Sequence, residues 1–160
     1  FVVLMAALTA WIMSLVGDDS PVSKPSTSVT SFPNTPPVLL KEKEAFTVPD
    51  NKPQKALVDG KTADRVNVEE GALVTLEKKT QLHVLQLSQY GATGNKFTVY
   101  GVDMADFDPQ DPEGTELAEG KLSSSKQDIE LEKVQEGFDG VLIMFDGKTA
   151  VSEMQVVGLS

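Results

Sequence analysis

Few side chains in this sequence are of a type that carries out catalysis. There is no cysteine and a single histidine, His83, so a thiol nucleophile, a disulfide framework and a zinc knuckle have no residues to build them. His83 lies in the strand-like stretch QLHVLQL, where a structural or solvent-facing role is expected rather than a place in a Ser–His–carboxylate triad. Arg65 is the only arginine, which nearly excludes bidentate clamps on phosphate or carboxylate. No pair of carboxylates is singled out for glycoside hydrolysis, and we expect no enzymatic activity.

Acidic residues dominate the charge of the chain. The formal net charge is −10 and the pI is about 4.5, which argues against binding to nucleic acid or to anionic lipid. One acidic run lacks the spacing and the central glycine of a helix-loop-helix calcium loop. It predicts a solvated hairpin loop, stiffened by proline, that is also a plausible contact surface for a partner. The run consists of Asp103, Asp106, Asp108, Asp111 and Glu113.

From Ala56 onward the pattern is that of an all-β sandwich. Short apolar or alternating segments are separated by turn signals every 8–15 residues, and no segment predicts an amphipathic helix of three turns. Val141–Phe145 is apolar throughout, so we expect a central strand that is covered on both faces. The other predicted strands are Ala72–Leu76, Gln81–Ser88, Lys96–Val102, Glu116–Ala118, Asp128–Leu131 and Ser152–Val157.

Four segments follow one another in an order that is known from a domain family. They are ALVDGKTADRV at Ala56–Val66, GALVTLEKKTQLHVLQL at Gly71–Leu87, KFTVYGVD at Lys96–Asp103 and SEMQVVG at Ser152–Gly158. Over about residues 53–160 the chain resembles the discoidin-type domains, which are coagulation-factor C-type, galactose-binding-like jelly rolls. The resemblance implies a jelly-roll β-sandwich with binding loops at one end.

Many members of that family hold a structural calcium ion between an Asp-Gly loop and the last strand. The resemblance places Asp59 and Glu153 at the matching positions, and Asp64 where the family has threonine. Val66 stands where the family has tryptophan. One expectation is therefore a calcium ion bound by Asp59, Asp64 and Glu153. The alternative is a loop pinned by hydrogen bonds from backbone amides to Asp59.

Carbohydrate-binding members of the family hold sugars with aromatic, arginine, histidine and asparagine side chains on loops. By this resemblance Tyr90, beside the glycine-containing loop 91–95, is the expected stacking residue, with Asn95 as its polar partner. Tyr100 lies within a predicted strand, where a packing role is expected.

The first stretch of the chain, Phe1–Gly17, carries no charge, and its only polar side chains are Thr9 and Ser14. As a helix it would span about 25 Å, slightly less than the hydrocarbon core of a bilayer. We expect a single transmembrane helix, with a cleaved signal peptide or a buried core helix as the alternatives. Small residues would let a neighbouring helix dock on it, namely Ala6, Ala7 and Ala10.

Residues 18–52 are rich in proline, serine and threonine, which predicts an extended spacer between the helix and the β domain. Within it, Val38–Leu40 and Phe46 are apolar enough to form contact points or the first strand of the domain. The acidic residues Asp18 and Asp19 directly follow the apolar stretch, which places the domain on the non-cytoplasmic face.

Together these parts predict a non-catalytic, single-pass membrane accessory subunit. Its β domain would bind and stabilise a larger membrane protein complex on the non-cytoplasmic side. A photosynthetic or respiratory complex is the expected host, and the thylakoid lumen is the favoured compartment. The alternative is a membrane-tethered or secreted carbohydrate-binding, lectin-like module. A third reading is an adhesion module that serves an enzyme on another chain.

Overall fold

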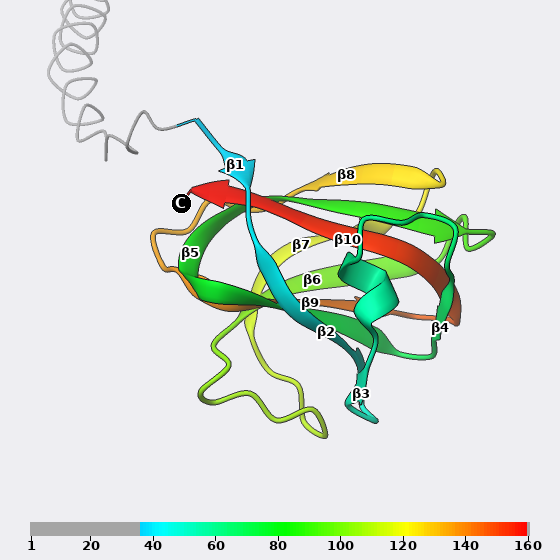
Figure 1. Cartoon of the computed structure of the whole chain (residues 1–160), viewed down its shortest axis with the longest axis horizontal. Coiled ribbons are helices and arrows are strands. Elements are labelled where there is room, and N and C mark those ends of the chain that lie inside the picture. Colours follow the sequence, from blue (N-terminus) through cyan, green and yellow to red (C-terminus); the bar gives the residue numbers. More distant parts are fainter. Residues whose placement is uncertain (1–35, 160) are drawn as a thin grey trace, which may run out of the picture. The chain divides into compact units, whose positions relative to one another are not determined.

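The computed structural model describes residues 36–159, which form two antiparallel β-sheets that share one long strand (Figure 1). The predicted all-β sandwich is confirmed. In chain order the elements are β1 (Val38–Leu39), β2 (Glu42–Val48), β3 (Lys52–Pro53), the 3₁₀ turn η2 (Lys55–Val58), β4 (Val66–Val68), β5 (Gly71–Tyr90), β6 (Lys96–Val102), β7 (Thr115–Lys121), β8 (Lys126–Glu130), β9 (Phe138–Phe145) and β10 (Thr149–Leu159).

Each sheet contains one half of β5. Sheet A has the strand order β1-β10-β5-β8, and β4 also pairs with β10. Sheet B has the order β3-β2-β5-β9-β6-β7. Figure 1 shows the two layers, with β8 and β10 in the upper one and β9 and β6 below.

Strand β5 joins two strands that the sequence predicts as separate, Ala72–Leu76 and Gln81–Ser88. The charged residues 77–79 between them are exposed, and there the strand bends from sheet B into sheet A. The Thr80 hydroxyl donates to the Leu159 carbonyl just after the bend. The charged residues 77–79 can therefore belong to one continuous strand, because they lie at the exposed bend between the two sheets.

The β domain begins before the boundary expected from the sequence. Residues 18–52 were expected to be a linker, yet β2 pairs with β5 along most of its length, and β1 pairs with β10. The backbone N–H of Leu40 also donates to Val156 O at 2.8 Å. Strands within residues 38–53 therefore belong to the sheets. This agrees with the alternative expectation that the segment forms the first strand of the domain.

The main core lies between the sheets, and β9 runs through the centre of sheet B. The side chains of Val141 and Ile143 are fully buried in this inner core. Leu142 is equally buried but points to the opposite side of the strand. The prediction that Val141–Phe145 is covered on both faces is confirmed.

A second apolar cluster covers the outer face of sheet B, where an antiparallel sheet commonly meets solvent. Its buried members are Val48, Leu73, Val102 and Leu142. The half-buried side chains packed against them are Phe46, Tyr100, Met104, Phe107 and Met144.

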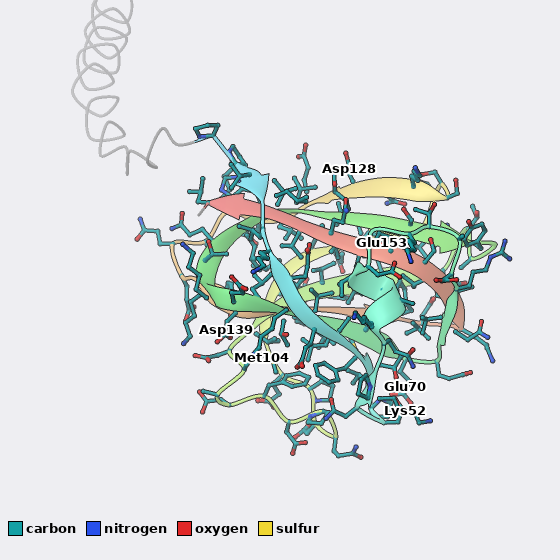
Figure 2. The ribbon with its side chains drawn as sticks, viewed as in Figure 1. Lys52, Glu70, Met104, Asp128, Asp139 and Glu153 are labelled. Carbon is teal, nitrogen blue, oxygen red and sulfur yellow. The ribbon has the colours of Figure 1, made fainter. Side chains whose placement is uncertain are left out.

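The loop 103–114, between β6 and β7, lies over this outer cluster and is fixed at two places. The Met104 N–H donates to Asp139 Oδ1 at 2.8 Å, and Figure 2 shows the two residues side by side. The Gln110 amide donates to Pro49 O at 2.7 Å. The loop joins the hairpin of β6 and β7, and most of its acidic side chains are exposed, as expected from the sequence. The sequence did not indicate that Met104 and Phe107 of this loop pack on the sheet.

Phe107→Ala is expected to lower the free energy of unfolding by about 1–2 kcal/mol, because the ring is half-buried against the outer cluster. Glu113→Ala, an exposed position in the same loop, is the matched control and should change stability by less than about 0.5 kcal/mol. Urea denaturation of both variants measures the difference. Equal effects of the two substitutions would mean that the loop does not pack on the sheet.

The expected transmembrane helix, Phe1–Gly17 with its docking face Ala6, Ala7 and Ala10, lies outside the described residues, as does the first part of the expected spacer. Within residues 36–159 no helix has the length and apolar character needed to cross a bilayer.

Candidate functional site

The outer face of sheet A carries polar side chains at regular intervals. Leu85 and Leu87 of β5 are buried in the core, so Gln86, Ser88 and Tyr90 alternate to the outer face. Directly paired residues of neighbouring strands point to the same face of a sheet. The residues of β8 and β10 that pair with these positions therefore form rows of polar side chains across the outer face.

The register defines two of these rows. Gln86 lies between Gln155 of β10 and Asp128 of β8, while Ser88 lies between Glu153 of β10 and Lys126 of β8. The loop after η2 rises beside them and makes the surface concave. The resulting groove has a volume of about 220 Å³. Its polar lining includes Gly60, Thr62, Gln86, Ser88, Lys126 and Gln155, together with two carboxylates, Asp128 and Glu153.

Tyr90 lies one position beyond Ser88 on the outer face, next to this groove. Its side chain is 37% exposed, and its hydroxyl donates to Thr62 O at 2.9 Å. The guanidinium carbon of Arg65 lies 3.7 Å from the centre of the Tyr90 ring. The aromatic residue proposed for sugar stacking is thus at the surface, and one of its neighbours is a cation that the sequence reasoning did not assign to the site.

Asn95 does not join this site. Its amide nitrogen lies 3.3 Å from each of three acceptors, Gly147 O, Lys148 O and Thr149 Oγ1. The side chain therefore ties the loop after β5 to the loop before β10. We correct its expected role from sugar contact to loop support.

Glu153 is a buried carboxylate on β10 beside η2 (Figure 2). Its side chain is only 6% exposed; Oε1 accepts a hydrogen bond from Gly60 N at 3.3 Å, and Oε2 has no partner among the described residues. Burial raises the pKa of Glu153, and the charges of Asp59 and Glu42 raise it further. Hydrogen bonds from the backbone N–H groups of Gly60 and Lys61 act in the opposite direction.

These residues meet part of the calcium expectation. Asp59 and Glu153 are close enough to interact, and an unpartnered buried carboxylate oxygen is a suitable ligand for a hard cation. Asp64 is exposed, and no three acidic or histidine side chains within residues 36–159 gather as a metal-binding group. A calcium ion at this place would therefore use two carboxylates and complete its shell with loop carbonyl oxygens. Asp59 Oδ1 also accepts from Lys61 N at 2.9 Å, so it pins the loop as the alternative reading expected.

The acidic run of the loop 103–114 shows mostly local interactions. Asp103 forms an ion pair with Lys79, and Asp108 Oδ1 accepts from Gln110 N at 2.9 Å within the loop. These contacts shape the loop and leave no arrangement of ligands that resembles a helix-loop-helix calcium site.

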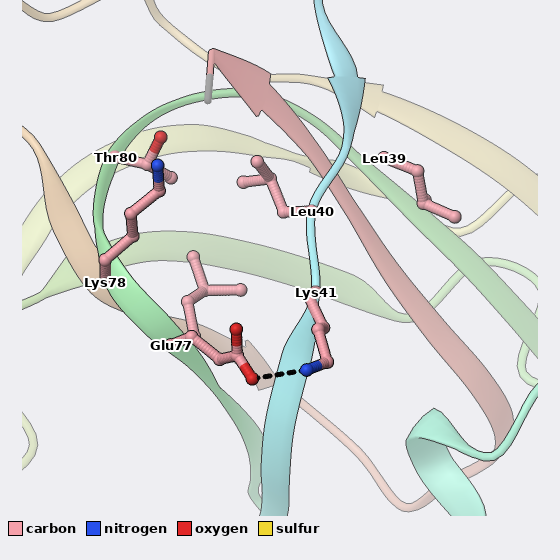
Figure 3. A pocket seen from close by; sticks show the side chains of 7 residues that line it. Leu39, Leu40, Lys41, Glu77, Lys78 and Thr80 are labelled. Atoms are coloured by element: carbon pink, nitrogen blue, oxygen red, sulfur yellow. Dashed lines mark hydrogen bonds and ion pairs between the residues drawn. The ribbon is translucent and has the colours of Figure 1, made fainter.

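A larger groove of about 420 Å³ lies where β1 and β2 face the bend of β5 (Figure 3). Leu39 and Leu40 contribute much of its apolar lining, and the ion pair between Lys41 and Glu77, at 2.6 Å, crosses it. Neither groove has an aromatic ring in its lining, but Tyr90 lies beside the smaller one, with its hydroxyl bonded to the lining residue Thr62. The groove beside Tyr90 is therefore the better candidate for a polar ligand with one apolar face.

No protein-family model and no curated protein matches the sequence. Solved structures with the same fold are found at low sequence identity. The module "CpGH89CBM32-6" from Clostridium perfringens has a TM-score of 0.54 and 14% identity over 74% of this chain and 93% of its own. The CBM32 of AlyQ, in complex with 4,5-unsaturated mannuronic acid, has a TM-score of 0.54 and 13% identity over 74% and 97%. A pectin-binding carbohydrate-binding module has a TM-score of 0.54 and 14% identity over 76% and 91%.

Some of the matching structures are parts of larger enzymes. In a Ruminococcus gnavus GH29 fucosidase the matching region is 24% of the chain, at a TM-score of 0.53 and 16% identity. At these identities the matches show a shared fold, and they add nothing to the membrane-subunit interpretation.

Proposed function

We propose that this domain, which has the discoidin-like, galactose-binding-like jelly-roll fold, is a non-catalytic carbohydrate-binding module. The observation that carries the proposal is the concave polar surface of sheet A that ends at the exposed ring of Tyr90. Structures of the same fold are solved with an unsaturated mannuronic acid and described as binding pectin.

The chemistry of the groove suits a sugar. A saccharide presents hydroxyl groups around its edge and C–H groups on its faces, and therefore needs both hydrogen bonds and a flat apolar partner. The side chains of Gln86, Ser88 and Gln155 make no hydrogen bonds to other described residues, so their polar groups are available to a ligand. Tyr90 provides a flat ring, one face of which carries the Arg65 guanidinium, so a sugar would stack on the part of the ring that Arg65 leaves exposed. The volume of the groove limits the tightest contacts to roughly one sugar unit.

A glycan array and subsequent titration calorimetry with the full chain test this function. Tyr90→Ala is expected to weaken binding by about fivefold, because stacking against a ring contributes on the order of 1 kcal/mol. Tyr90→Phe retains the ring but loses the hydrogen bond to Thr62, so it should bind nearly as well as the wild-type protein.

Two results would contradict the proposal. If the folded wild-type protein bound none of the glycans, carbohydrate binding itself would be wrong. If Tyr90→Ala bound as tightly as the wild type, the sugar site would lie elsewhere on the domain. An unrelated exposed substitution on sheet B, Glu119→Ala, controls for general effects on the protein.

A further inference from the structure

Arg65 lies on the ring of Tyr90, beside the part of the groove that Thr62 lines. Its guanidinium carbon lies 3.7 Å from the centre of the Tyr90 ring, within the range of a cation–π interaction. The ring itself is fixed at both ends, by the backbone of β5 and by the hydrogen bond from its hydroxyl to Thr62 O. The flexible arginine side chain therefore has a rigid surface to lie on.

The hydrogen-bonding groups of Arg65 are uncommitted. Four ion pairs join the described residues, and none of them includes Arg65, although the chain carries a net charge of −10. No side-chain hydrogen bond within the described region involves it either. A planar guanidinium has five N–H donors directed along its edges, and stacking on a ring covers its face but leaves those edges open.

We infer that Arg65 makes this groove selective for sugars that carry a carboxylate, the uronic acids. The stacked guanidinium offers two parallel N–H donors to a carboxylate, the arrangement that gives the strongest and most directional charge-assisted pairing. Gln86 and Ser88 then lie further along the groove for the hydroxyl groups of the same or a neighbouring sugar unit. Lys126 is a second cation along the groove and also takes no part in an ion pair among the described residues.

Carboxylates more than a Debye length away, about 8 Å at about 0.15 M salt, are screened. Two carboxylates, Asp128 and Glu153, line the groove itself and oppose an anionic ligand there. The carboxylate of the sugar is therefore expected at the Tyr90 end, against the guanidinium of Arg65. The single arginine of the chain is sufficient for such a contact, because one guanidinium, ordered by an aromatic ring, supplies both donors of a bidentate pair.

The inference rests on the proposed carbohydrate binding and is tested by separating the carboxylate from the rest of the sugar. The probes are a trigalacturonate and its methyl ester, which differ only in the charge of their carboxyl groups. With the full chain at pH 7 and about 0.15 M salt, calorimetry is expected to give at least tenfold tighter binding of the free acid. Arg65→Gln should remove this preference and leave the affinity for the methyl ester within about twofold. Arg65→Lys keeps the charge but not the planar fork, and we expect it to retain only part of the preference.

Lys133→Gln is the matched control, since it removes one exposed cation from the β8–β9 loop, outside the groove, and should change neither affinity. Equal binding of acid and ester by the wild type, or an equal loss of both in Arg65→Gln, would overturn the inference while leaving the carbohydrate-binding function in place. Absence of binding to either probe and to every neutral glycan on the array would instead reject the proposed function. Thermal melting of each variant confirms that the compared proteins are folded.

Discussion

Leu142→Ala is expected to lower the free energy of unfolding by about 2–5 kcal/mol. Leu142 is fully buried, yet it points away from the main core, into the cluster between sheet B and the loop 103–114. Truncation removes the buried methyl groups and leaves a cavity that the packed strands on either side cannot close. Urea denaturation monitored by circular dichroism measures the loss.

Ile143→Ala is the matched comparison, because the two residues are neighbours on β9 and face opposite sides of sheet B. We expect the two substitutions to cost similar amounts. A second test combines Leu142→Ala with Phe107→Ala, which should be non-additive by at least 0.5 kcal/mol because both residues belong to one cluster. A cost below about 1 kcal/mol for Leu142→Ala would show that the outer face of sheet B is open to solvent.

The sandwich was predictable because its evidence is local. Alternation in Lys96–Val102 and the unbroken apolar run in Val141–Phe145 specify which side chains are buried, and both segments are strands in the structure. The bend of β5 was not predictable in this way. Three consecutive charged residues would be exposed in a turn between two strands, and they are also exposed in a strand that bends between two sheets. The sequence pattern is therefore the same for both structures.

The first strands could be predicted only as an alternative to contact points in a spacer, for a related reason. Prolines on both sides of β2 favour an extended chain, and an extended chain is compatible with a spacer as well as with a strand. What decides between them is pairing with β5, more than twenty residues further along the chain. Such pairing is long-range and leaves no local signal.

The candidate site was half predictable. Tyr90 was identified because an aromatic residue beside a glycine-containing loop is noticeable in the sequence. Arg65 was not connected with it, because the contact depends on the register of three strands. Val66 of β4 pairs with Val151, and the adjacent Ala150 pairs with Tyr90, which brings the residue before β4 over the ring. Asn95 has the right type and position for a sugar contact, but its amide is used to hold a loop.

Glu153→Gln is expected to stabilise the protein by about 1–3 kcal/mol at pH 7 in the presence of a chelator. The carboxylate of Glu153 is buried as a charge, and one of its oxygens has no partner among the described residues. Burial raises the pKa of Glu153, and the neighbouring charges of Asp59 and Glu42 raise it further, so the charged form destabilises the folded protein. A neutral amide of the same size removes the buried charge and keeps an oxygen for the N–H of Gly60. Its NH2 group would replace the unpartnered Oε2, which offsets part of the gain. Thermal or urea unfolding of both proteins measures the difference.

The sign of the pH dependence follows from the direction of the shift. A carboxyl group whose pKa is raised on folding favours the folded state when it is protonated. That contribution is complete below the usual value of 4.5 and is lost as the pH rises through the raised pKa. The advantage of Glu153→Gln should therefore be largest at neutral pH and should disappear as the pH falls below about 4.5. A constant difference in stability between the two proteins across this pH range would mean that burial does not destabilise the charged form of Glu153.

Calcium should narrow the difference between the two proteins, and should reverse it if the advantage of Glu153→Gln is below about 2.7 kcal/mol. If Asp59 and Glu153 bind a calcium ion together with loop carbonyl oxygens, the ion supplies the missing partner of Glu153 Oε2. At a calcium concentration of about 100 times the dissociation constant, the wild-type protein should gain about 2.7 kcal/mol. Glu153→Gln should gain much less, and Asp64→Asn should respond like the wild type because Asp64 stands apart from the two carboxylates. An identical response of all three proteins would reject the calcium site and leave Asp59 as a residue that only pins its loop.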